Sequence, residues 1–291
     1  MNGIFGEISY KFKYGSILTK LIVINTAIFI VVKMVDLFSF LAGTMPFSQT
    51  IADFFALYAN LSHLALHPWG IITYMFIHAG FLHILFNMLW LYWFGVIFLN
   101  FLDEKRFLRV YIWGGLAGAV FFVLAYNIFP GLAAEGYFVR VIGSSAAVLA
   151  IVTAISAYMP DYVIYLMFIG PVRIKYVALV TILIDLISIP YGANAGGHIA
   201  HLGGALYGYW FAVNMRKGKD IAALFSVPHK KKHRLKVKRN RYKTRNDWEY
   251  NAIKKEDNEK LDRILDKIAQ NGYDSLTEEE KRFLFESSKR N

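Results

Sequence analysis

A serine and a histidine lie in two separate apolar segments of this 291-residue chain. Ser145 follows Gly143 and Ser144 at the start of one segment, and His201 lies inside another. Polar side chains in membrane segments are costly and usually functional. A hydroxyl and an imidazole in contact can perform nucleophilic catalysis, because the imidazole takes the hydroxyl proton and later returns it to a leaving amine.

Hydrogen-bond donors for the negative charge of such a reaction are also present. His83 and Asn87 lie one helical turn apart in a third apolar segment, and both side chains can donate to a developing oxyanion. The backbone N–H of Ser145 is a further candidate, because the first N–H groups of a helix have no partner within that helix.

Six apolar stretches must position these residues. Hydrophobic residues make up 56% of the chain and charged residues 18%, against about a quarter charged in soluble domains. A helix that crosses a bilayer needs about 20 apolar residues. The stretches that reach or approach this length are residues 18–41, 71–102, 107–128, 145–159, 176–189 and 197–213. They predict an all-α, polytopic membrane protein with six transmembrane helices.

The candidate residues share one predicted depth in the membrane. Asn87, Ser145 and His201 lie sixteen, sixteen and fifteen residues before the first charged residue that follows each one. At about 1.5 Å per residue, each lies about 22–24 Å above the inner boundary of the bilayer core. The stretch at 145–159 spans only about 22 Å, so its first residue should lie inside the outer half of the membrane. The positive end of the helix dipole would then face a buried cavity.

Small residues predict close packing between the fourth and sixth stretches. Spacings of three and four residues place them on one face of each predicted helix, which lets the two backbones approach closely. The sixth stretch carries Gly197, His201, Gly204 and Gly208, and the fourth carries Ala147, Ala150, Ala154 and Ala157. We assign Gly143, Gly204 and Gly208 to close packing.

Charge placement predicts the orientation of the chain. Residues 1–215 hold ten Lys and Arg against eight Asp and Glu, whereas residues 216–291 hold twenty-two against thirteen. Basic residues flank alternate ends of the stretches, so both termini should be cytoplasmic, in what we expect to be a bacterial cytoplasmic membrane. The basic run abuts the last stretch, which favours anionic lipid as its partner over nucleic acid, and we expect no nucleic acid.

Three regions are expected along the chain. Residues 1–215 form the membrane domain, residues 216–245 a basic linker, and residues 246–291 a helical hairpin. In the hairpin, Leu261, Ile264, Leu265 and Ile268 would share one apolar face. Gly272 suits a helix C-cap, and Thr277 with Glu280 makes a capping box for the second helix.

Two other site chemistries are compatible with the polar residues. His78, His83, His198 and His201 could bind a metal, but the sequence lacks the His-Glu-x-x-His signature, and we expect no metal or cofactor. A proton or ion pathway would need charged residues within the membrane, for which Lys33, Asp36 and Asp185 are the candidates. Lys33 and Asp36 stand at helical spacing, so we interpret them as a structural pair.

Three motifs together resemble the rhomboid family of intramembrane serine proteases. They are Gly143-Ser144-Ser145, Ala200-His201-Leu202-Gly203-Gly204 with Gly208, and the decapeptide from His78 to Asn87. The resemblance covers about residues 68–214. It implies Ser145 as nucleophile and His201 as base in a dyad without an acidic member, with His83, Asn87 and the Ser145 N–H as the oxyanion hole. The implied substrate is a single-span membrane protein that enters past the fifth stretch and is cut within or near its membrane segment.

The chain departs from the family pattern at three places. Ala146 stands where rhomboids typically have Gly, Leu149 where an aromatic residue is common, and Trp69-Gly70 where a Trp-Arg pair is common. A rhomboid-like pseudoprotease, which binds membrane segments without cutting them, is the alternative function. Such proteins usually lack the serine or the histidine, and both are present here.

Overall fold

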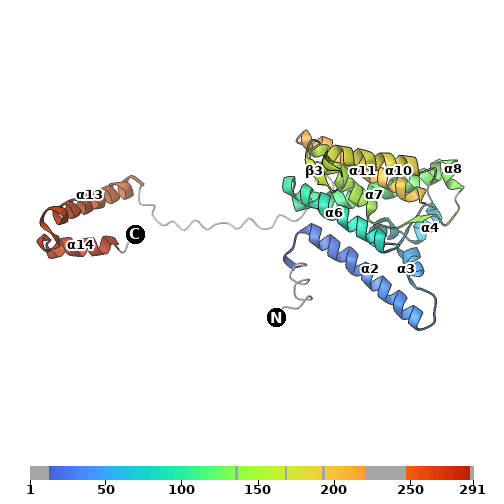
Figure 1. Ribbon diagram of the computed structural model, residues 1–291, viewed down its shortest axis with the longest axis horizontal. Helices are drawn as coiled ribbons and strands as arrows, with labels where there is room; N and C mark the ends of the chain where they lie inside the picture. Colours follow the sequence, from blue (N-terminus) through green and yellow to red (C-terminus); the bar gives the residue numbers. More distant parts are fainter. Residues whose placement is uncertain (1–12, 135–136, 168, 192–193, 221–246, 289–291) are drawn as a thin grey trace. The chain divides into compact units, whose positions relative to one another are not determined.

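The structure is a computed structural model that describes residues 13–134, 137–167, 169–191, 194–220 and 247–288. The chain divides into two compact units, Met1–Pro228 and His229–Asn291 (Figure 1). The tail region predicted as a basic linker, residues 216–245, lies outside the described residues from position 221 onward. The three-region division therefore stays a proposal.

The first unit contains the six expected helices, which confirms the all-α class. They are α2 (Ile17–Leu41), α6 (Phe81–Phe101), α7 (Glu104–Ile128), α9 (Ser145–Tyr158), α10 (Ile174–Ser188) and α11 (Ala195–Arg216). Among the described residues, α2, α6 and α7 are each long and apolar enough to cross a membrane on their own. Helices α9 and α10 are shorter, and the small residues of α11 lower its hydropathy.

The second stretch, residues 71–102, is long enough to include a short segment before its membrane helix, and the structure has such a segment. Short turns α5 (Gly70–Thr73) and η1 (Tyr74–Phe76) come first, and α6 begins only at Phe81. Gly80 precedes it in an extended conformation, which separates the turns from the helix. The break places His83 and Asn87 in the first two turns of α6.

The segment that leads into α9 is anchored by backbone hydrogen bonds. Strands β1 (Leu57–Tyr58) and β2 (Arg140–Val141) pair antiparallel, with Leu57 opposite Val141. Two residues later, the N–H of Gly143 donates to the carbonyl of Tyr74 at 2.8 Å. These contacts fix the position at which α9 starts.

Other short elements connect the helices. Helices α3 (Ser48–Phe55), α4 (Leu61–Leu66) and α8 (Pro130–Ala133) belong to the connections on the side where α9 begins. Strands β3 (Val163–Leu166) and β4 (Gly170–Arg173) form a hairpin between α9 and α10, with Val163 opposite Arg173.

Helix α9 is the buried centre of the bundle. Its residues from Ala146 to Ser156 are all buried. A Cβ added at Gly204 or Gly208 of α11 would lie 2.1 or 2.2 Å from a backbone oxygen of α9, so only glycine permits this approach. The predicted close packing at Gly204 and Gly208 is therefore what the structure shows.

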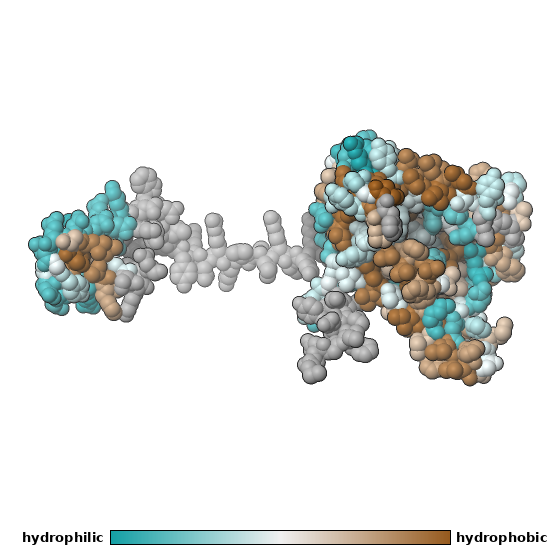
Figure 2. All heavy atoms as spheres, in the orientation of Figure 1, coloured by the Kyte–Doolittle hydropathy of each residue, from teal (hydrophilic) through white to brown (hydrophobic). Residues whose placement is uncertain are grey.

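The outer faces of the helices are apolar. Figure 2 shows apolar side chains gathered in broad patches on the visible face of the first unit. On α10, seven large hydrophobic side chains are about half exposed or more. These seven are Tyr176, Leu179, Val180, Leu183, Ile184, Leu186 and Ile187. Such a surface suits contact with lipid hydrocarbon rather than with water.

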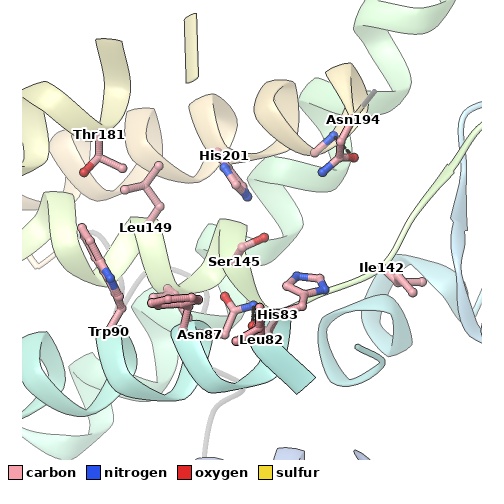
Figure 3. Close-up of a pocket in the computed structure, with 13 residues that line it drawn as sticks. Leu82, His83, Asn87, Trp90, Ile142, Ser145, Leu149, Thr181, Asn194 and His201 are labelled. Carbon is pink, nitrogen blue, oxygen red and sulfur yellow. Dashed lines mark hydrogen bonds between the residues drawn. The ribbon is translucent and has the colours of Figure 1, made fainter. Parts of the chain in front are cut away.

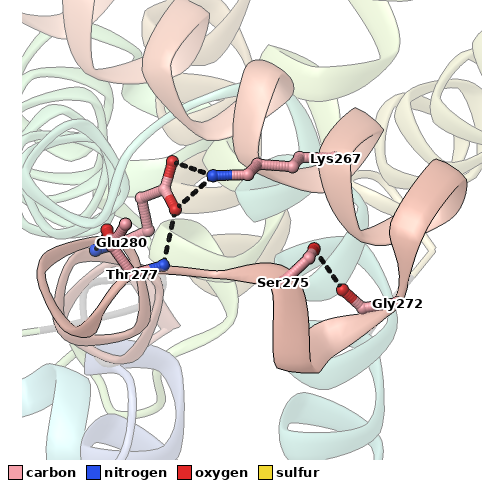
Figure 4. A network of polar contacts seen from close by, with 5 residues as sticks. All are labelled: Lys267, Gly272, Ser275, Thr277 and Glu280. Carbon is pink, nitrogen blue, oxygen red and sulfur yellow. Dashed lines mark hydrogen bonds and ion pairs between the residues drawn. The ribbon is translucent and has the colours of Figure 1, made fainter.

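The second unit is a helical hairpin made of α13 (Asp247–Asn271), η2 (Tyr273–Ser275) and α14 (Glu278–Ser288). Gly272 ends α13 with a φ of +75°, and the Thr277–Glu280 capping box forms with N–H···O distances of 2.8 and 3.3 Å. Lys267 of α13 also bonds both Glu280 oxygens (Figure 4). Of the predicted apolar face, Ile264 is buried, whereas Leu265 is 47% exposed.

Candidate active site

A cavity of about 390 Å³ lies among α6, α9, α10 and α11. It brings together Ser145, His201, His83 and Asn87, which come from three different helices (Figure 3). The complete lining is Leu82, His83, Phe86, Asn87, Trp90, Ile142, Ser145, Val148, Leu149, Thr181, Asn194, Gly197 and His201. The common depth predicted for Asn87, Ser145 and His201 agrees with this shared cavity.

The two adjacent serines have different surroundings. Ser145 is the first residue of α9 and lines the cavity. Ser144 is fully buried, and its Oγ lies 3.1 Å from Nε2 of the buried His78. Ser145 is therefore the serine that a molecule in the cavity can reach.

The contacts of His83 indicate which ring nitrogen carries its proton. The N–H of Ala79 donates to His83 Nδ1 at 3.4 Å, so a neutral His83 ring carries its hydrogen on Nε2. A Cβ added at Gly143 would lie 2.7 Å from this Nε2 and 3.7 Å from Ser145 Oγ. Gly143 also has a φ of +126°, which side chains rarely tolerate. Glycine at position 143 thus lets the His83 donor sit beside the serine.

The Asn87 side chain has a second N–H hydrogen beyond the one that it uses within its own helix. Its Nδ2 donates to the carbonyl of His83 at 2.9 Å, and an amide group carries two hydrogens. The second hydrogen is available to the cavity that Asn87 lines.

His201 contacts a carboxylate. Its Nδ1 lies 2.8 Å from Oδ1 of Asp185 on α10, and Nδ1 of His198 lies 2.7 Å from the same oxygen. With Nδ1 engaged, Nε2 is the nitrogen left for Ser145, and Figure 3 shows the His201 ring and the Ser145 hydroxyl pointing toward one another. In the described part of the chain, His201 and Ser145 do not form a hydrogen bond with each other. Catalytic hydrogen bonds are often long without substrate and shorten when substrate binds.

The Asp185 contact differs from the expectation of a pair without an acidic member. Sequence reasoning considered Asp185 only for an ion pathway. A buried carboxylate in an apolar helix needs a partner, and this requirement could have pointed to a contact with a histidine. Lys33 and Asp36, by contrast, pair with each other at 3.2 Å, as predicted.

The histidines considered for a metal site separate into different environments. His78 contacts Ser144, and His83 lies beside Gly143. Among the described residues, ligand atoms of Asp185, His198 and His201 lie within 4.8 Å of one another, so these three form a group that could hold an ion.

Ala146, which follows Ser145 at a position where rhomboids typically have glycine, has room for its methyl group. A Cβ added at Gly118 of α7 would lie 2.6 Å from the Ala146 Cβ. Glycine at position 118 therefore leaves room for the extra methyl group, and α9 keeps its close contact with α11 through Gly204.

The fold and the cavity define a polytopic membrane protein with a serine, a histidine and hydrogen-bond donors converging inside its helical bundle. Residues 65–218 match the Rhomboid domain, and the chain belongs to the rhomboid family. Residues 246–290 match a family of unknown function, DUF6576.

Two curated relatives are mitochondrial rhomboid-like proteins. The chain is 32% identical over 157 residues to RHOMBOID-like protein 12, mitochondrial, of Arabidopsis thaliana, covering 51% of this chain and 47% of that protein. It is 25% identical over 146 residues to the human Presenilin-associated rhomboid-like protein, mitochondrial, covering 47% of this chain and 35% of that protein. The chain thus spans about half or less of the length of these relatives.

Proposed function

We propose that this protein is an intramembrane serine endopeptidase that cuts single-span membrane proteins within or near their membrane segment. The observation that carries the proposal is the position of Ser145, which is the first residue of a buried helix and lines the same cavity as His201. Membership of the rhomboid family supports the same activity.

The chemistry assigns one task to each side chain. Ser145 Oγ bonds to the carbonyl carbon of the scissile peptide while His201 Nε2 takes the hydroxyl proton. The carbonyl oxygen becomes negative and accepts hydrogen bonds from His83, Asn87 and the Ser145 N–H.

The intermediate then collapses and the carbon–nitrogen bond breaks, with the imidazolium giving its proton to the leaving amine. Water, deprotonated by the same imidazole, next attacks the acyl group on Ser145. This step releases the new carboxyl terminus and restores the serine.

The cavity walls suit a membrane segment as substrate. Phe86 and Trp90 of α6 and Thr181 of α10 form part of the lining, so the cavity lies against both helices. An apolar peptide that unwinds between α6 and α10 would bring its backbone to Ser145 without leaving the membrane.

Cleavage of a purified single-span test substrate in detergent checks the proposal. The wild-type protein should cut it, and Ser145→Ala and His201→Ala should each lose the activity. Ser144→Ala is the matched control, because Ser144 is buried and lies against His78. Equal cleavage by all four proteins would rule out the Ser145–His201 pair.

A fluorophosphonate probe assigns the nucleophile directly. It should label Ser145 in the wild-type protein and in Ser144→Ala, and peptide mapping should find no label on Ser144. A folded wild-type protein that binds the substrate but neither cuts it nor takes the label would support the pseudoprotease alternative.

Two further assignments belong to the proposal. Both termini would face the cytoplasm of a bacterial cell, as the basic residues indicate, although the curated relatives are mitochondrial. The basic tail would contact anionic lipid next to the membrane.

A further inference from the structure

We propose that Asp185 is a positioning residue that completes a Ser145–His201–Asp185 triad, with His198 as a second hydrogen-bond partner of the carboxylate. This inference rests on the proposed protease function. It adds a carboxylate from α10 to a site otherwise built from α6, α9 and α11.

The first support is geometric. Asp185 Oδ1 lies 2.8 Å from His201 Nδ1, a distance typical of a hydrogen bond between a ring N–H and a carboxylate. The Asp185 side chain is only 5% exposed, so water does not compete strongly for this oxygen. The contact joins α10 to α11 at the level of the cavity.

The second support is the tautomer that the contact imposes. A carboxylate accepts hydrogen bonds, so it selects the His201 tautomer with hydrogen on Nδ1. The Nε2 lone pair then faces Ser145, as a general base requires. When Nε2 takes the serine proton, the same carboxylate stabilises the imidazolium that forms.

The third support is the presence of His198. A lone carboxylate in an apolar helix is costly, and His198 Nδ1 donates to the same oxygen at 2.7 Å. His198 lies one turn before His201 on α11, and its side chain is 21% exposed. The His198 ring N–H therefore gives the buried carboxylate a second hydrogen-bond partner beside His201.

A bound metal ion is the competing interpretation of the same three residues. Zn²⁺ with ligand bonds of about 2.0 Å in tetrahedral geometry would hold neighbouring ligand atoms about 3.3 Å apart. The 2.7 and 2.8 Å separations at Asp185 Oδ1 are shorter and correspond to direct N–H···O contacts. The geometry therefore favours positioning over metal binding.

The test uses Asp185→Asn and Asp185→Glu in the full chain. Asp185→Asn should lower kcat at least about 100-fold with little change in KM, because an amide can donate to Nδ1 and select the wrong tautomer. Fluorophosphonate labelling of Ser145 should slow in parallel, and Asp185→Glu should recover part of the rate. Asp36→Asn is the matched control, since it removes a carboxylate from another apolar helix far along the chain from the cavity.

A tautomer measurement separates this inference from the proposed function. NMR of ¹⁵N-histidine-labelled wild-type protein should show an Nδ1–H signal that disappears in His201→Ala and shifts in Asp185→Asn. That signal requires no catalysis, so it tests the Asp185 contact even if the wild-type protein fails to cleave or label.

Three results would overturn the triad. They are a kcat for folded Asp185→Asn within about threefold of the wild-type value, a His201 ring protonated only on Nε2, or cleavage that EDTA abolishes and Zn²⁺ restores. If Asp185→Asn does not fold, the wild-type tautomer and Asp185→Glu decide the question.

Discussion

Asn87 and Asn214 make the same local contact but lie in different surroundings. Each side chain donates to the carbonyl four residues earlier, His83 for Asn87 and Trp210 for Asn214. Only Asn87 lines the cavity beside Ser145. A comparison of Asn87 and Asn214 variants can therefore separate the proposed catalytic role of the Asn87 amide from the role of such an amide within its helix.

Asn87→Ala should lower kcat by about 10²–10³-fold and leave KM nearly unchanged, because one donor to the transition-state oxyanion is lost. Asn214→Ala should behave like the wild-type protein. Steady-state cleavage of the test substrate measures both. A variant of Asn87 that changes only KM would show that the amide binds substrate and does not stabilise the oxyanion.

The departure from the family pattern at Gly70 is explained by a backbone atom next to this glycine. A Cβ at Gly70 would lie 2.2 Å from the carbonyl oxygen of Ala56. An arginine at this position would therefore need a different path for the chain at Ala56, just after the end of α3. The neighbouring Trp69 stays anchored, donating from its indole N–H to the carbonyl of Phe54.

At the scale of elements, the contact between α9 and α11 depends on glycine. Gly204→Val would place a branched side chain where a Cβ already lies 2.1 Å from the Ala146 carbonyl oxygen. We expect a loss of at least about 1–3 kcal/mol and loss of cleavage, because the helices must move apart. The thermal unfolding midpoint in detergent measures the first effect.

The matched control for Gly204 is on the same helix. Leu206→Val changes a side chain that is 54% exposed, and it should leave both the midpoint and the cleavage rate unchanged. A Gly204→Val protein with wild-type stability would show that the two helices are not held at this contact.

The C-terminal hairpin has a carboxylate whose titration should be measurable. The Lys267 ammonium, together with the Thr277 N–H, lowers the pKa of Glu280 from its ordinary value of 4.5. The lowered pKa means that ionised Glu280 stabilises the folded hairpin. This contribution is present above pH 4.5 and is lost as the pH falls through the lower folded-state pKa.

Hydrogen exchange of the α13 and α14 amides in the full chain measures this dependence, after correction for intrinsic exchange rates. Protection should fall as the pH is lowered from 6 toward about 3. Glu280→Gln should have weaker protection at pH 6 and a smaller pH dependence. Identical pH profiles for the two proteins would contradict the assignment to Glu280.

For the whole molecule, the six crossings predicted from the sequence would place both ends of the membrane domain on one side of the membrane. The natural chain has no cysteine, so single cysteines report position cleanly. In sealed, oriented vesicles, an impermeant maleimide should label Lys13→Cys and Lys219→Cys from the same side. It should label Gln49→Cys, in α3, only from the other side of the membrane. If Lys13→Cys and Lys219→Cys were labelled from different sides, the number of crossings would be odd, which would contradict six.

The helices of the membrane domain, and the four polar residues His83, Asn87, Ser145 and His201 that line the cavity, could be predicted from the sequence. Apolar length and the charged residue after each stretch predicted a common depth for Asn87, Ser145 and His201 in the bilayer. Small residues at helical spacing predicted the approach of α9 and α11, because a missing side chain permits backbone contact whatever the neighbouring loops do.

Tertiary contacts, which the sequence does not specify, set which polar groups meet at this common depth. The contact of Asp185 with His201 depends on how α10 is rotated about its axis, which depth along a helix does not specify. The different surroundings of Ser144 and Ser145 likewise depend on the β1–β2 pairing and the Gly143–Tyr74 hydrogen bond that orient the start of α9. Depth follows from local composition, whereas side-chain direction follows from contacts between segments far apart in the chain.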